Sequence, residues 1–262
     1  MQFIVKGYPA YAYTGGRPFD PALPAIVFIH GAAMDHSAWQ WQSRYFAHHG
    51  FCVLAVDLPG HGRSPGPLRG SIEALGDWIS ALIEAASFAK VHVVGHSMGS
   101  LVALDVALRH RARVTRLALI GTSIPMPVGE SFLAAAKDDS PAAFDMEAVW
   151  GHAREAPLAG SPVPGTWLMG ASRQLIGRAT AGVQFAYLGA CHGFAPTWNS
   201  IRALDAPTLV IAGRRDVMTP HKAAEQVANE IPGARFVVLD AGHSMMSEAP
   251  RNTLEALRAF LA

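Results

Sequence analysis

One serine in the sequence has neighbours that are typical of a nucleophile. Gly95-His96-Ser97-Met98-Gly99 has the form Gly-x-Ser-x-Gly, between an apolar run at residues 91–94 and a helical pattern at 98–110. A sharp turn from a strand into a helix would expose the Ser97 hydroxyl, and the flanking glycines let the backbone pass closely. The N-terminus of the helix would favour the negative charge that develops on attack. We therefore predict a nucleophile at Ser97 and not an ordinary glycine-rich turn.

A serine hydroxyl needs a base to take its proton, and the base needs a carboxylate to orient it. His243 and Asp216 each come shortly after one of the last two apolar runs of the chain. Residues that follow parallel strands gather at one edge of the sheet, so Ser97, Asp216 and His243 are expected to meet there. Asp240 is the rival acid. It stands so close before His243 that its reach to the far side of the ring is awkward.

The oxygen that becomes negative during attack needs two backbone N–H groups aimed at it. Met98, directly after the nucleophile, is expected to supply one of them. The second is expected from Ala32, in the loop after the apolar run at residues 25–29, where Gly31 makes the turn. Together these two amides would form the oxyanion hole.

The sequence holds 12 histidines, and most fall in predicted loops or at helix ends, which favours solvated or structural roles. His152 and His192 lie among later helical stretches and could contact a substrate. No His-Glu-x-x-His or similar ligand spacing occurs in the sequence. We therefore predict no metal site and no cofactor.

Short apolar runs alternate with helical patterns along most of the chain. Strands that are apolar at nearly every position are buried on both faces, which is typical of a parallel sheet with helices on each side. The segment through Tyr13 alternates instead and is expected to form an antiparallel edge. The expected strands are residues 25–29, 52–56, 91–94, 114–120, 208–212 and 236–239, and the expected helices are 39–49, 71–86, 98–110, 221–231 and 251–261.

Residues 123–203 do not continue the alternation of strands and helices. They contain no convincing strand, and helical stretches fall at 130–137, 142–154 and 166–179. A segment of this length is too long for a loop in a compact domain. We therefore predict an α/β core formed by residues 1–122 and 204–262, with a helical cap inserted at 123–203.

Four groups of residues follow one another in the order found in enzymes of the α/β-hydrolase fold that carry a helical cap, and the chain resembles that family. The resemblance implies an eight-stranded, mostly parallel sheet. It also implies the nucleophile, acid and base roles for Ser97, Asp216 and His243, and the oxyanion roles for Ala32 and Met98. Haloalkane dehalogenases and epoxide hydrolases resemble this fold but have aspartate at the elbow, which argues against both. The matching groups are His30-Gly31-Ala32, residues 57–64 as a structural turn, Gly95-His96-Ser97-Met98-Gly99, and Gly213-Arg214-Arg215-Asp216 with Gly242-His243.

The composition argues against nucleic acid and membranes as binding partners of the protein. The 262-residue chain has 21 Lys and Arg against 20 Asp and Glu, a net charge of +1, which gives no electrostatic footprint for nucleic acid or an anionic membrane. No signal-peptide pattern is visible, and no apolar run approaches the ~18 residues of a membrane span. We expect a cytoplasmic monomer or homodimer that acts on a small molecule.

The expected reaction is hydrolysis of a carboxylic ester of a fairly apolar small molecule, through an acyl-enzyme on Ser97. The same residues could instead cleave a carbon–carbon bond, a lactone or a thioester. A ligand-binding member of the fold without catalysis is the alternative from another class. The apolar side chains available in the predicted cap, each favoured as part of the cap core over a substrate contact, are Met146, Trp150, Trp167, Leu168, Met169 and Phe185.

Overall fold

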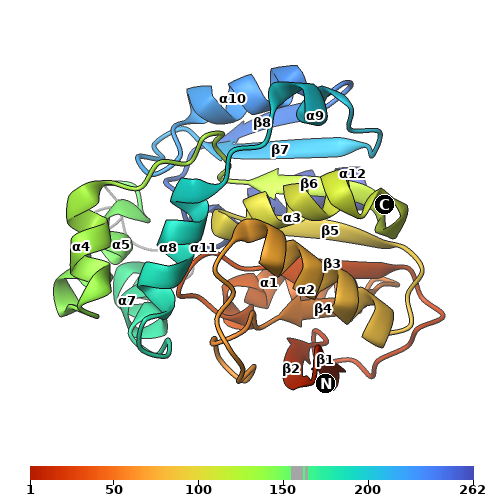
Figure 1. The fold of residues 1–262 in the computed structure, drawn as a ribbon. Helices are drawn as coiled ribbons and strands as arrows, with labels where there is room; N and C mark the ends of the chain where they lie inside the picture. The colour runs from red at the N-terminus through yellow and green to blue at the C-terminus, as the bar shows by residue number, and fades with distance from the viewer. Residues whose placement is uncertain (155–161, 163–164) are drawn as a thin grey trace.

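A computed structural model describes residues 1–154, 162 and 165–262, and it contains one eight-stranded sheet (Figure 1). The strand order is β1-β2-β4-β3-β5-β6-β7-β8. The β1–β2 and β2–β4 pairs are antiparallel and all other neighbours are parallel, which confirms the predicted sheet and its antiparallel edge. The strands are β1 Gln2–Val5, β2 Tyr8–Tyr13, β3 Ala25–Ile29, β4 Cys52–Val56, β5 Val91–His96, β6 Val114–Ile120, β7 Thr208–Gly213 and β8 Arg235–Leu239.

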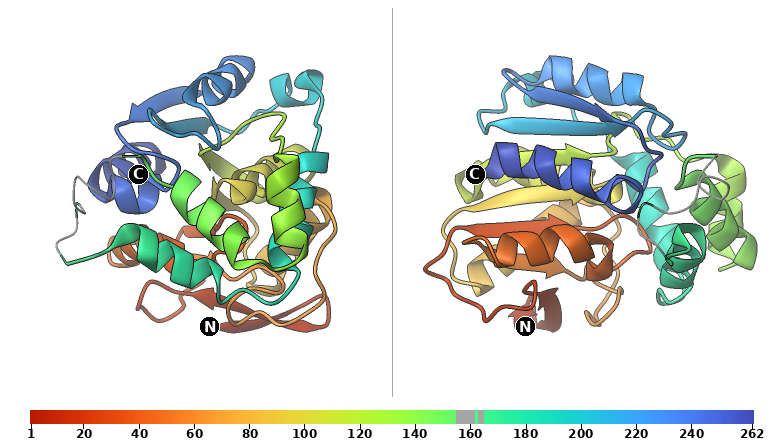
Figure 2. Two further views of the ribbon diagram at one scale, coloured as in Figure 1. Left: turned by 90° about the vertical axis from the view of Figure 1, so that its left-hand side faces the viewer. Right: turned by 180° about the vertical axis from the view of Figure 1, so that it is seen from behind.

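The central strands are buried on both faces because helices cover the sheet on both sides. In β3, Val27 and Ile29 join one apolar core while Ile26 and Phe28 join the other, as the alternation of side chains along a strand requires. The first core is completed by α2 Ile72–Ala85, α3 Met98–Arg109 and α10 His221–Glu230. The second is completed by α1 Gln40–Ala47 and α12 Pro250–Leu261, which lie in front of the sheet in the right-hand view of Figure 2.

Four helices between β6 and β7 lie beyond one end of the sheet (Figure 1), and the left-hand view of Figure 2 looks directly onto them. A fifth, α9 Trp198–Arg202, lies instead beside α10 against the core. Two short 3-10 helices, η1 His36–Trp39 and η2 Arg111–Arg113, and the one-turn α11 Met245–Glu248 complete the described elements. The four helices at the sheet end are α4 Glu130–Lys137, α5 Pro141–Trp150, α7 Leu168–Ile176 and α8 Val183–Gly193.

The structure differs from the sequence prediction mainly in these helices. The helix predicted over residues 142–154 ends at Trp150, since the chain turns at Gly151 and docks on the core. The sequence pattern did not predict α8, which contains Gly189 and Gly193, residues of low helix propensity. Its helical form is stabilised by burial of Tyr187 and its apolar neighbours, a tertiary effect that local propensity does not contain.

The described helices are short. The longest, α2, has 14 residues and buries one face against α3. Across the described ranges, no helix combines the length and apolar character needed to cross a membrane.

Candidate active site

Ser97 occupies a strained turn between β5 and α3. Its backbone has φ 53° and ψ −121°, a conformation that costs a residue with a Cβ on the order of 1–3 kcal/mol. Glycine is required on both sides. A Cβ on Gly95 would lie 2.0 Å from the carbonyl oxygen of Gly99, and a Cβ on Gly99 would lie 2.3 Å from that of Ile29. The turn therefore has the form that the Gly-x-Ser-x-Gly pattern predicts.

Asp216 and His243 lie together in the structure although 27 positions separate them in the chain. His243 Nδ1 donates a hydrogen bond of 2.7 Å to Oδ2 of Asp216. The other oxygen of this carboxylate, Oδ1, accepts from the backbone N–H groups of Met218 and Thr219, each at 2.8 Å. The Thr219 hydroxyl donates to Oδ2 at 2.6 Å. Asp216 is thus fixed by its own loop, and its charge is directed at the imidazole.

The two side chains shift each other's pKa. Burial alone would raise the pKa of Asp216, but the charge and hydrogen bond of His243 outweigh it, so this pKa lies below its ordinary value. Burial alone would lower the pKa of His243, but the Asp216 carboxylate outweighs it, so this pKa lies above its ordinary value. The pair therefore stabilises an imidazolium, the form that a base takes after it has accepted a proton.

The imidazole of His243 faces Ser97 across a small cavity. Both residues line it, and Nε2 of His243 has no hydrogen-bond partner within the described chain. In this structure the Ser97 hydroxyl and Nε2 are not hydrogen bonded to each other, a contact that in unliganded enzymes is often long and tightens when substrate binds. Ser97, Asp216 and His243 thus gather at one edge of the sheet, as predicted.

The rival acid, Asp240, lies elsewhere. Its side chain is 78% exposed and forms an ion pair of 3.2 Å with Arg215. Nδ1 of His243 is instead bonded to Asp216, so the Asp240 carboxylate is not the partner of the ring.

The two residues predicted to donate backbone N–H groups, Ala32 and Met98, are both neighbours of Ser97. Met98 is the first residue of α3, where the N–H groups have no partner within the helix. Ala32 lines the small cavity together with Ser97, and the loop that carries it approaches closely, since a Cβ on Gly31 would lie 3.3 Å from Cβ of Ser97. Both predicted residues therefore lie beside Ser97, Met98 as the next residue in the chain and Ala32 across the small cavity.

Ser97 also opens onto a larger cavity of about 590 Å³ between the sheet end and the helices beyond it. Of the apolar side chains that the sequence singled out, Trp150 lines this cavity, whereas Trp167 is 73% exposed and Leu168 lines a separate surface groove. His152 lines it, whereas His192 accepts a hydrogen bond from the N–H of Val128. The lining residues are Ala32, Ser97, Met126, Pro127, Val128, Gly129, Phe132, Val149, Trp150, His152, Arg154, Leu188, Cys191, Val217, Met218 and Thr219.

Cys191 brings a thiol to this cavity. Burial raises the pKa of its thiol to about 12, so the thiolate is scarcely populated near neutral pH. The strained turn is instead at Ser97, which shares the small cavity with His243.

Comparison with known proteins agrees with this geometry. The family model described as "Alpha/beta hydrolase family" matches residues 26–256. The chain therefore belongs to the alpha/beta hydrolase family.

Several hydrolases are similar to this chain in sequence or in fold. It is 30% identical over 252 residues to a pimeloyl-[acyl-carrier protein] methyl ester esterase of Chromobacterium violaceum, covering 91% of this chain and 94% of the relative. It is 26% identical over 246 residues to an (E)-2-((N-methylformamido)methylene)succinate hydrolase of Acinetobacter baylyi, covering 90% and 89%. Its fold matches that of the enol-lactonase from Burkholderia xenovorans LB400 with a TM-score of 0.85 and 23% identity, covering 100% and 99%.

The sequence analysis missed three residues that lie at the site in the folded hydrolase. Thr219 had a local signal, because an aspartate three positions earlier often accepts from the backbone in such turns. His96 donates from Nε2 to the carbonyl oxygen of His243 at 2.9 Å, which fixes the loop of that residue. Glu147 of α5 lines the small cavity beside Ser97. For His96 and Glu147 no spacing in the sequence indicated a role.

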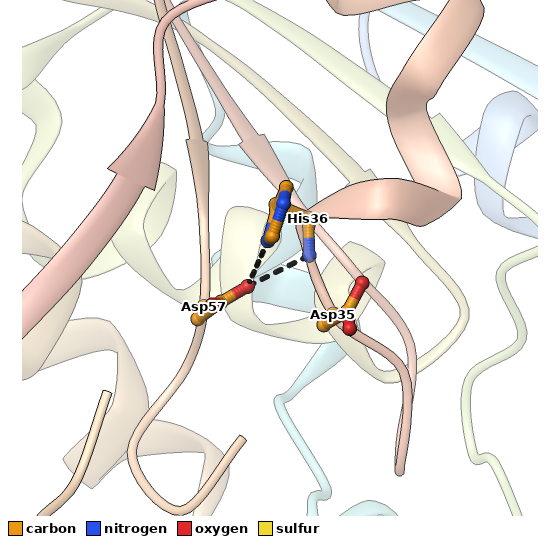
Figure 3. A group of neighbouring side chains, drawn as sticks. All are labelled: Asp35, His36 and Asp57. Carbon is orange, nitrogen blue, oxygen red and sulfur yellow. Dashed lines mark hydrogen bonds and ion pairs between the residues drawn. The ribbon is translucent and has the colours of Figure 1, made fainter. Parts of the chain in front are cut away.

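A second polar cluster in the hydrolase lies at the ends of β3 and β4 (Figure 3). Asp35, His36 and Asp57 each offer an atom within 4.8 Å of the others. Asp57 Oδ1 accepts from both the N–H and Nδ1 of His36, and its Oδ2 accepts from the N–H of Arg63. Asp35 accepts from the N–H of Ser37 and thereby caps η1. These bonds fasten the turn after β4 to the loop after β3, which is a structural role.

Proposed function

We propose that this hydrolase cleaves a carboxylic ester of a fairly apolar small molecule through an acyl-enzyme on Ser97. The observation that carries the proposal is the convergence of the strained Ser97 turn with the buried Asp216–His243 pair at the base of a largely apolar cavity. In this proposal Ser97 is the nucleophile, His243 the general base and Asp216 the acid that orients it.

Acylation begins when the ester carbonyl lies against Ser97. His243 Nε2, which is free of other partners in the described chain, takes the hydroxyl proton as Oγ attacks the carbonyl carbon. The Asp216 carboxylate stabilises the imidazolium that forms. The imidazolium then gives its proton to the departing alcohol oxygen, which leaves the acyl group on Ser97. Water later reverses these steps and releases the acid.

The negative oxygen of each tetrahedral intermediate is held by the N–H groups of Ala32 and Met98. Loss of one such donor typically costs about 2.7–4 kcal/mol of transition-state stabilisation. The N-terminus of α3 adds to this, because its partial positive charge lies beneath the oxyanion. The loop after β3 and the turn after β5 therefore act together on the same atom.

The shape of the larger cavity supports an apolar substrate. Met126, Phe132, Trp150, Leu188 and their neighbours provide most of its wall, and about 590 Å³ lies within the usual range of small-molecule sites. We propose that residues 123–203 act as the cap that closes this cavity, since α4, α5 and α8 supply much of the wall. A similar protein is named a methyl ester esterase, which also supports an ester as the bond cleaved.

An active-site-directed fluorophosphonate tests the proposal. The folded protein should be labelled on Ser97, and labelling should be lost in Ser97→Ala. Cys191→Ala is the matched control, because it removes the thiol of the same cavity and should label like the wild type. Absence of labelling in the folded wild type would refute the serine-hydrolase mechanism and favour a ligand-binding role.

A substrate panel then tests the bond type. Carboxylic esters of graded acyl length should be turned over faster than matched lactones, thioesters and carbon–carbon ring-cleavage products. Preference for one of the other three would retain Ser97 as nucleophile but replace the ester assignment.

A further inference from the structure

A buried carboxyl group lies within reach of the proposed reaction but has no part in it so far. Glu147, on α5, is 6% exposed and lines the small cavity that also contains Ser97 and His243. Placing a carboxyl group in such surroundings costs stability unless its oxygens find partners. A charged or ionisable group in this position therefore points to a function.

The partners of Glu147 are incomplete. Gln184 of α8 donates from Nε2 to Oε2, whereas Oε1 receives no hydrogen bond from the described chain. The titratable groups that face it are His243, from the loop after β8, and Cys191, from α8. Burial raises the pKa of Glu147 to about 7, against the hydrogen bond from Gln184 and the charge of His243. Near neutral pH a substantial share of Glu147 is thus ionised and able to accept a hydrogen bond.

The position of Glu147 is fixed relative to His243 by direct contacts. The N–H of Ser244 donates to the carbonyl oxygen of Gly151 at 2.8 Å, one helical turn after Glu147. The N–H of Ala153 donates to Oε2 of Glu248 at 2.9 Å. The backbone of Gly242 passes so closely that a Cβ there would lie 2.3 Å from the nitrogen of Ala153. The end of α5 is therefore fastened to the loop that carries the general base.

The small cavity has room for one water molecule. Its volume is about 20 Å³, and a water needs ~10–15 Å³ and two to four polar partners. Its walls offer the unpartnered Nε2 of His243, the Ser97 hydroxyl and the Glu147 carboxylate. Of these groups, Nε2 of His243 and the Ser97 oxygen are the two that lie beside the attacking oxygen when an acyl group on Ser97 is hydrolysed.

We propose that Glu147 is a further catalytic residue, which accepts a hydrogen bond from the water that attacks the acyl group on Ser97 and holds it beside Nε2 of His243. This inference rests on the proposed acyl-enzyme mechanism. The water oxygen bonds to the acyl carbon, and one of its protons passes to Nε2 while the other stays on the oxygen and is directed at Glu147. The carbon–Oγ bond then breaks, Oγ takes the proton from Nε2, and the carboxylic acid leaves.

Rapid-mixing experiments with a p-nitrophenyl ester separate the two half-reactions. Release of p-nitrophenol reports acylation, and mass spectrometry of acid-quenched samples reports formation and decay of the acyl group on Ser97. In Glu147→Leu we expect unchanged acylation and deacylation slowed by about tenfold to 10²-fold, because a reactant misplaced by about 1 Å can lose 10²-fold in rate. Asp145→Asn is the matched control, an exposed carboxylate on the same helix, and should change neither step.

The pH dependence of deacylation provides a second readout that a purely structural role would not alter. Both His243 and Glu147 must be deprotonated for the water to be held and activated. The wild-type rate should therefore fall below neutrality more steeply than one titrating group allows. Glu147→Gln keeps the shape of the side chain but cannot ionise, so its profile should follow a single group.

Three results would overturn the inference. They are unchanged deacylation in Glu147→Leu, a loss confined to acylation or KM, and a Glu147→Gln profile as steep as that of the wild type. If the wild type forms no acyl group on Ser97, the acyl-enzyme itself is refuted and this inference with it. Normal acylation with normal deacylation in the variants refutes this inference alone.

Discussion

Gly121 offers a sharp test of how the structure positions the proposed base. It directly follows β6 and has φ +60°, a conformation that favours glycine. A Cβ added to it would lie 3.1 Å from Cε1 and 3.2 Å from Nδ1 of His243, closer than side-chain atoms ordinarily pack. Gly121→Ala therefore crowds the imidazole ring, and the next nearest atom to the added Cβ is Cε of Met245 at 3.3 Å.

Gly121→Ala should have two effects, one on the free energy of unfolding and one on kcat/KM. The left-handed backbone costs a residue with a Cβ about 1–2 kcal/mol, which should lower the free energy of unfolding by that amount. The ring must also move by a few tenths of an ångström. Since a misplacement of about 1 Å can cost 10²-fold in rate, we expect kcat/KM to fall by about tenfold. Gly233→Ala is the matched control, because it has φ +68° but no atom within 4 Å of the added Cβ.

The assay combines urea unfolding with steady-state hydrolysis of a p-nitrophenyl ester. Both variants should lose comparable stability, and only Gly121→Ala should lose activity. Wild-type kcat/KM in Gly121→Ala would show that contact with the His243 ring does not control its catalytic position. An equal loss of activity in both variants would attribute the effect to backbone strain alone.

Three further predictions concern the Asp216–His243 pair. Asp216→Asn should lower kcat by about 10⁴-fold, because the carboxylate that orients His243 is lost, whereas Asp240→Asn should leave kcat near the wild-type value. The reverse pattern in ester hydrolysis would identify Asp240 as the acid. The value of kcat/KM should fall as the pH drops through a point above the ordinary histidine pKa of about 6.5, because the pKa of His243 is raised and its protonated ring cannot take the Ser97 proton. An inflection well below about pH 6.5 would contradict the pairing of His243 with Asp216. Thr219→Val should lower the free energy of unfolding by about 1.5–3 kcal/mol, because Asp216 loses a hydrogen bond to its charged oxygen, and denaturant unfolding measures the change.

The sequence predicted the elements of the core well because their signals are local. Runs such as Ala25–Ile29 and Cys52–Val56 are apolar at every position, and the structure contains those strands with the same bounds. The Ser97 turn was also predictable, since glycines at 95 and 99 are the residues that its crowded backbone can accept. By contrast, α8 gave no clear local signal, because burial of Tyr187 and its neighbours stabilises it.

The order of residues indicated a serine, an acid and a histidine, and it favoured Asp216 over the rival acid Asp240. The choice depends on where the loops after β7 and β8 run, and the structure directs Asp216 at His243 while Asp240 points into solvent. Glu147 and Gly121 had no signal at all. Their importance arises from α5 and β6 lying against a loop more than 90 residues away in the chain. Local spacing fixes backbone conformation, whereas contacts between distant segments exist only once the sheet has brought them together.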